Sequence, residues 1–100
     1  MYYKVVTQDL KSLGLRKNPT IMTFPIGEKV FEKGKIFKDN RDSGGIWVAN
    51  SIGNARTLRK YMKSKYNIDC RIFSVEIGIV LYQNSYRTKT NYVRLEEEVI

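Results

Sequence analysis

Hydrophobic and polar positions follow the two-residue period of a β-strand in several segments of this chain. Aromatic and β-branched residues predict a first strand at Tyr2–Thr7 (YYKVVT), and a short apolar run predicts a buried strand at 45–50 (GIWVAN). Residues 70–82 (CRIFSVEIGIVLY) predict the longest strand, with Gly78 as a bulge or bend. Its alternation places the odd positions in the core: Phe73, Val75, Ile77, Ile79 and Leu81. Residues 92–97 (YVRLEE) predict a last strand.

One segment has the 3.6-residue period of a helix. At 100° per residue, its apolar residues share a narrow sector: Ala55, Leu58, Met62 and Tyr66. An adjoining sector holds the cations Arg56, Arg59, Lys60 and Lys63. Ser51 or Asn54 can cap the start, and Asn67 can adopt the left-handed conformation at the end. The main helix is therefore expected at about residues 53–66.

The remaining segments are short and rich in turn residues. Residues 9–14 (DLKSLG) predict a helical turn capped by Asp9, and 20–26 predict a short edge strand interrupted by Pro25. Residues 28–37 (EKVFEKGKIF) predict a hairpin. Polar loops are expected at 16–19, at 38–45, which is the best candidate for a mobile loop, and at 84–91. Together these elements predict an α+β fold, in which a mostly antiparallel sheet of about five to six strands packs against one main helix.

Length and composition favour a single folded domain. The chain has 100 residues, of which 42% are hydrophobic, enough for one core and not for two. No segment reaches the roughly 18 apolar residues of a membrane span, and the N-terminus lacks the apolar core of a signal peptide. These features predict one soluble, cytoplasmic domain over residues 1–100 with no membrane partner.

The residue types present exclude several kinds of chemistry. The chain has no histidine and one cysteine, Cys70, so an internal disulfide and histidine-based acid–base catalysis are excluded. A zinc or haem site would need carboxylates or a second chain. Asp39, Asp42 and Glu76 show no paired spacing, and the two nucleotide-binding glycine motifs are absent. No catalytic residue, metal ligand or cofactor is assigned.

The charge is strongly positive and concentrated in two segments. Eighteen Lys and Arg against ten Asp and Glu give a formal net charge of +8, which favours acidic partners. The helix and the segment 84–94 (NSYRTKTNYVR) supply most of the candidates, because neither contains an acid and the second adds tyrosines that can stack on bases. The predicted polyanion-binding residues are Arg56, Arg59, Lys60, Lys63, Tyr86, Arg87, Lys89 and Arg94.

Part of the chain resembles a known family. The succession GGIWVA, NARTLRKYMKSKY and RIFSVEIGIVLY, within residues 44–98, resembles the ADP-ribosyltransferase-like fold. That resemblance implies an NAD-binding strand and a catalytic glutamate on a later strand. The family usually has an Arg or His on its first strand, where this chain has only Lys4, and none of Glu96, Glu97 and Glu98 is matched to the catalytic glutamate. Lys-, Asn-, Ile- and Tyr-rich usage is also typical of small proteins from AT-rich bacteria and their phages.

Three functions follow from these observations. The preferred one is a small, non-enzymatic binding module whose basic face docks on nucleic acid or on an acidic protein surface. The second is a divergent ADP-ribosyltransferase-like enzyme or NAD-binding domain. The third is an inhibitory partner protein that pairs an exposed sheet edge with another chain.

Overall fold

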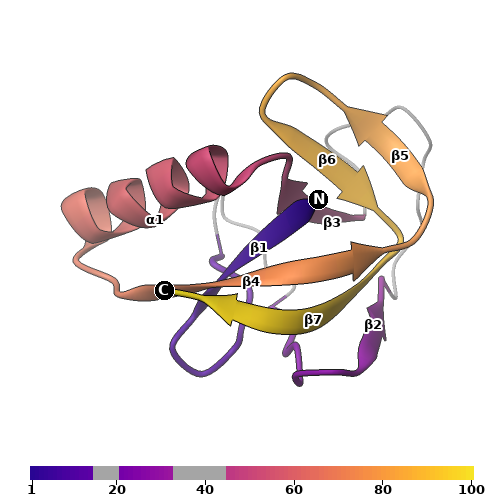
Figure 1. The fold of residues 1–100 in the computed structure, drawn as a ribbon. Coiled ribbons are helices and arrows are strands. Elements are labelled where there is room, and N and C mark those ends of the chain that lie inside the picture. Colours follow the sequence, from indigo (N-terminus) through magenta and orange to yellow (C-terminus); the bar gives the residue numbers. More distant parts are fainter. Residues whose placement is uncertain (15–20, 33–44) are drawn as a thin grey trace.

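The computed structural model describes residues 1–14, 21–32 and 45–100, and within them it contains one helix and seven strands (Figure 1). In chain order the elements are β1 (Tyr2–Thr7), β2 (Lys29–Phe31), β3 (Ile46–Ala49), α1 (Ile52–Tyr66), β4 (Cys70–Ile77), β5 (Val80–Gln83), β6 (Arg87–Thr90) and β7 (Tyr92–Val99). The predicted α+β class is confirmed, and the sheet has seven strands rather than five to six.

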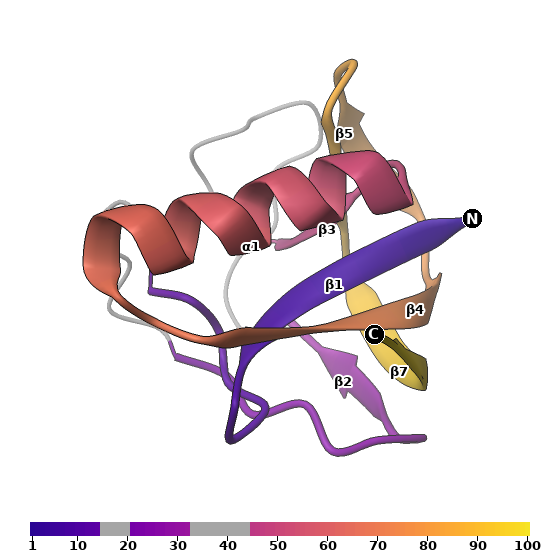
Figure 2. The ribbon, with the colours of Figure 1, turned by 60° about the vertical axis from the view of Figure 1, so that its left-hand side comes forward.

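All seven strands belong to one antiparallel sheet in the order β2-β7-β4-β1-β3-β6-β5. The first strand is therefore central, with Tyr3 opposite both Ala49 of β3 and Ser74 of β4. The edges are β2 and β5. Helix α1 packs across β1, β4 and β3, and the turned view in Figure 2 shows it on one side of β1 and β4 with β2 on the other.

Apolar side chains are buried on both faces of the sheet. The helix-side core contains Val5, Ala49, Ala55, Met62, Cys70 and Ile72. The opposite core contains Val6, Phe24, Ile46, Val48, Phe73, Val75, Val93 and Leu95. Consecutive residues of β1, and likewise of β4, thus point into different cores, because successive side chains of a strand lie on opposite faces of the sheet.

Helix α1 begins and ends at local capping signals. The Ser51 hydroxyl accepts a hydrogen bond from the Asn54 amide (3.1 Å), and Asn67 is left-handed (φ 56°) with its N–H donating to the Lys63 carbonyl (3.0 Å). The helix, its cap at Ser51 and its end at Asn67 agree with the sequence prediction.

The segment after β1 does not form the predicted helical turn. Leu10 has a positive φ of 63°, its N–H donates to the Thr7 carbonyl (3.0 Å), and the Lys11 N–H donates to the Thr7 hydroxyl oxygen (3.0 Å). This tight turn reverses the chain, so that Lys11 forms a bridge with Thr23. Of the edge strand predicted at 20–26, the described residues 21–26 contain that bridge alone, and the next residue, Phe24, is buried with its N–H donating to the Leu10 carbonyl (2.8 Å).

The predicted long strand at 70–82 is two strands. The chain bends at Gly78, where the Gly78 N–H donates to the Tyr92 carbonyl (3.1 Å) and the Ile79 N–H donates to the Asn91 side-chain oxygen (2.9 Å). The bend at Gly78 was expected, but the assignment of Ile79 to the core is wrong, since its side chain is 61% exposed. Leu81 beyond the bend is buried, as predicted.

The predicted polar connection at 84–91 contains a strand, β6, in which Thr88, Lys89 and Thr90 are fully buried. These polar residues tolerate burial because they are hydrogen-bonded: the Thr88 hydroxyl donates to the Asn50 side-chain oxygen (2.6 Å) and accepts from the Gln83 amide (2.7 Å). Of the hairpin predicted at 28–37, β2 is described, and it pairs with β7. The predicted loop at 16–19, and the loop at 38–45 apart from Gly45, lie outside the described residues.

Candidate polyanion-binding site

Four of the five cations of α1 line one side of the helix, and the fifth, Lys65, contacts Tyr61 instead. A shallow depression of about 520 Å³ runs beside it, and we call this the cationic groove; it is lined by Arg56, Arg59, Lys60, Lys63, Ser64, Asp69 and Cys70. Spacings of three and four residues bring the four cations together, because a helix repeats every 3.6 residues. Asp69 is the one acid among these lining residues, and its carboxylate pairs with the Lys63 ammonium at 3.0 Å.

Cys70 lies at the floor of the groove as an unreactive thiol. Burial raises the pKa of the Cys70 thiol, and the neighbouring Asp69 charge raises it further, against a smaller opposing effect of Arg59. A thiol with a raised pKa stays protonated and is a poor nucleophile.

Tyr86 is presented by a tightly hydrogen-bonded turn between β5 and β6. The Asn84 side-chain oxygen accepts from the amides of Tyr86 and Arg87, both at 2.9 Å. The Tyr86 carbonyl accepts from the Asn54 side-chain amide and the Asn50 N–H, both at 3.1 Å. The turn is thus fixed against the start of α1, while the Tyr86 side chain is 68% exposed.

Arg87 and Lys89, two residues apart on β6, both lie near the Trp47 ring. The Arg87 guanidinium carbon lies 3.8 Å from the centroid of the Trp47 ring, and Tyr82 meets that ring edge-on at 5.8 Å. The Lys89 ammonium lies 5.9 Å from the same centroid, but the residue is fully buried. Lys89 is therefore buried beside Trp47, whereas the helix cations line the cationic groove.

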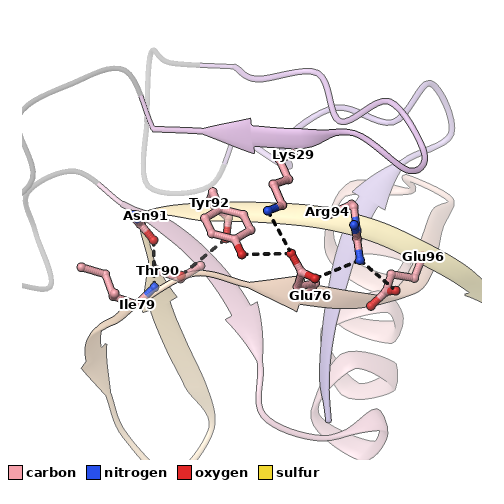
Figure 3. Close-up of polar contacts among 8 residues, drawn as sticks. All are labelled: Lys29, Glu76, Ile79, Thr90, Asn91, Tyr92, Arg94 and Glu96. Carbon is pink, nitrogen blue, oxygen red and sulfur yellow. Dashed lines mark hydrogen bonds and ion pairs between the residues drawn. The ribbon is translucent and has the colours of Figure 1, made fainter.

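Arg94 belongs to an ion-pair network around Glu76 on β4 (Figure 3). The Arg94 guanidinium pairs with Glu76 at 2.9 Å and with Glu96 at 3.6 Å, and the Lys29 ammonium lies 3.8 Å from Glu76. The Tyr92 hydroxyl donates to the Glu76 carboxylate (2.9 Å), which raises the pKa of Tyr92. Arg94 is thus neutralised beside β2, away from the helix cations with which it was grouped.

The acids that the structure describes lie apart from one another or pair with cations. Among residues 1–14, 21–32 and 45–100, no three Cys, Asp or Glu side chains gather closely enough to hold a metal ion. The Arg71 guanidinium donates to both carboxylate oxygens of Glu98 (2.7 and 3.0 Å), and this pairing lowers the pKa of Glu98. Among the residues that the structure describes, no helix is both long enough and apolar enough to cross a membrane.

Lys4 on β1 is largely removed from water, an environment that the sequence pattern did not predict. Its ammonium donates to the Trp47 carbonyl (2.6 Å) and lies 5.3 Å from the centroid of the buried Phe24 ring. Removal from water disfavours the charged form, so burial lowers the pKa of Lys4 from 10.5 to about 8.

This shift gives a pH dependence of stability. Between about pH 8 and 10.5 the unfolded chain binds more protons at Lys4 than the folded chain, so stability rises with pH. Relative to Lys4→Met, the wild type is expected to gain about 2 kcal/mol in free energy of unfolding between pH 7 and 10. Urea unfolding of both proteins at each pH measures this difference. Parallel pH profiles for the two proteins would show that Lys4 titrates normally.

Comparison of the chain with protein-family models, with curated protein sequences and with solved structures gave no match.

Proposed function

We propose that this protein is a non-enzymatic binding module that docks on nucleic acid through the cationic groove. The observation that carries the proposal is the convergence of Arg56, Arg59, Lys60 and Lys63 on one groove. Within the described part of the chain, ion pairs involve Lys63 but not the other three, so most of the positive charge faces solvent unneutralised. Cations in this state can replace the counterions of a phosphate backbone.

The three consecutive acids of β7 are not part of the cationic groove. Glu96, Glu97 and Glu98 line a second depression with Tyr3 and Ser74 at the end of β7, and none of them lines the cationic groove. The groove therefore keeps its cations apart from these acids, two of which are already paired with Arg94 and Arg71.

The groove is tested by a matched pair of double variants. Arg56→Gln/Lys60→Gln removes two charges from the groove, and Lys11→Gln/Lys29→Gln removes two half-exposed charges from elsewhere. The groove variant is expected to bind nucleic acid about 10-fold more weakly at low salt, with a salt slope shallower by about 1.5. The control variant should stay within about twofold of the wild type, as measured by fluorescence anisotropy over a salt series.

Two results would contradict the proposal. Equal losses in both double variants would mean that bulk charge drives binding rather than the groove. Absence of binding to DNA and RNA at low salt would remove nucleic acid as the partner and leave the acidic protein surface.

The sheet edges favour a second candidate, an inhibitory partner that extends another chain's sheet. β2 and β5 are the edge strands, and each exposes an apolar side chain: Phe31 is 52% exposed and Val80 is 43% exposed. The NAD-dependent alternative stays a prediction. Gly44 lies outside the described residues, and Glu96 and Glu98 are engaged by Arg94 and Arg71.

A further inference from the structure

Exposed tyrosines accompany the cations of α1. Tyr61 is 42% exposed, Tyr66 is 47% exposed and Tyr86, on the turn tied to the helix start, is 68% exposed. From the sequence, Tyr86 is a candidate for stacking, Tyr66 falls in the apolar sector of the helix, and Tyr61 carries no prediction. We call these three residues the aromatic flank.

Tyr61 and Asn54, the residue that anchors Tyr86, lie across the helix from the cationic groove, whereas Tyr66 lies only about 80° from Arg56. At 100° per residue, Tyr61 lies about 140° around the axis from Arg56, and Asn54, which holds the Tyr86 carbonyl, lies about 160° from it. The exposed crest between the two sides carries the small residues Gly53, Thr57 and Ser64. An extended polymer can therefore lie along the crest with one side on cations and the other on rings.

The rings of the aromatic flank are held in place before any ligand arrives. The Lys65 ammonium donates to the Tyr61 hydroxyl (3.0 Å) and lies 5.4 and 5.5 Å from the ring centroids of Tyr61 and Tyr66. Those two rings meet edge-on at 6.1 Å. Tyr86 projects from the turn fixed by Asn50, Asn54 and Asn84. Preorganised rings lose less entropy on binding than mobile ones.

We propose that the partner is a single-stranded nucleic acid, with its phosphates on the cationic groove and its bases stacked on Tyr61 and Tyr86. The inference rests on the proposed function and names its substrate class. In a duplex the bases are stacked on one another, so exposed rings add nothing to its binding. In a single strand each base offers a π-face to a ring, and an adjoining cationic track binds the backbone.

The experiment compares three ligands of equal length: a single-stranded oligonucleotide, its duplex, and an abasic strand that keeps the phosphates without the bases. At fixed low salt, the wild type is expected to bind the single strand about 5- to 100-fold more tightly than the abasic strand. Tyr61→Ala and Tyr86→Ala should each lose affinity for the single strand and keep the affinity for the abasic strand. Tyr61→Phe and Tyr86→Phe keep the ring and should bind as the wild type does.

The outcomes separate this inference from the proposed function. If the wild type binds all three ligands with equal affinity and the alanine variants bind them as the wild type does, the single-strand assignment is overturned while docking on phosphates stands. If the alanine variants lose both ligands equally, the tyrosines act on the fold and not on bases, which also overturns it; thermal unfolding of each variant checks this point. If no ligand binds, both the proposed function and the inference fail.

Discussion

Replacement of Ile72 by alanine is expected to lower the free energy of unfolding by about 2–5 kcal/mol, whereas the same replacement at Ile79 should change it by less than about 0.5 kcal/mol. Ile72 is fully buried between β1 and α1 in the helix-side core, so alanine leaves a cavity there. Ile79 is 61% exposed beside the bend at Gly78, so its truncation returns little surface to water.

The pair is a direct check on the two-sided core. A single-faced sheet with odd positions inward would reverse the result, because Ile79 would be buried and Ile72 exposed. Urea unfolding of both variants under the same conditions gives the comparison, and equal m-values show that the two native states are equally compact. Similar losses at both positions would contradict the burial described here.

Gly45→Ala is expected to destabilise the protein by about 2–5 kcal/mol, and Gly27→Ala by only about 1–2 kcal/mol. Both glycines have a positive φ, 87° and 84°, so each alanine pays the same backbone strain. At Gly27 an added Cβ meets no atom within 4 Å, but at Gly45 it meets the Lys89 stem, 2.6 Å from Cδ. Because Lys89 is fully buried, its stem has little room to move away.

Thermal unfolding of the two glycine variants separates steric from conformational cost. The difference between them is the part due to the close approach of β3 to Lys89. If both variants lose the same stability, the approach at Gly45 is relieved by a small shift and the buried position of Lys89 is less constrained than its packing indicates.

The elements that sequence reasoning located are those whose signals are local. Ser51 and Asn67 set the ends of α1 through bonds to residues three to five positions away, so their types alone indicate the boundaries. The two apolar positions of β7, Val93 and Leu95, are likewise buried as their alternation predicts. In each case the residues adjacent in sequence are enough to predict the structure.

The elements that were missed depend on distant partners. The sequence of β6 predicts a polar loop because Thr88, Lys89 and Thr90 are hydrophilic. Asn50 and Gln83 hydrogen-bond to the Thr88 hydroxyl, but only the fold shows that they are its neighbours. The turn after β1 reads as a helix start because Asp9 is a common cap. There the Thr7 hydroxyl and the bridge of Lys11 to Thr23 favour a chain reversal instead.

In the candidate site too, some placements follow from local spacing and others depend on contacts between distant residues. The four helix cations share a groove because their spacing alone places them on one side of a helix. Arg94 and Lys89 were grouped with them because of their proximity in sequence to Tyr86, but Lys89 is buried in β6 and Arg94 pairs with Glu76, and neither lines the groove. The anchoring of Tyr86 to Asn54 had no local signal, since it joins residues 32 positions apart.

The strand order also constrains how the molecule reaches its folded state. β7 lies between β2 and β4, so residues 29–31 are joined to the sheet through residues 92–94, and the central β1 must wait for β3 and β4. Such distant pairings close large loops and slow folding toward the millisecond-to-second range. On a ribosome, β2 would therefore emerge well before its partner strand is synthesised. The short length of β2, three residues with Lys29 at one end, limits the chance that this waiting edge captures another nascent chain.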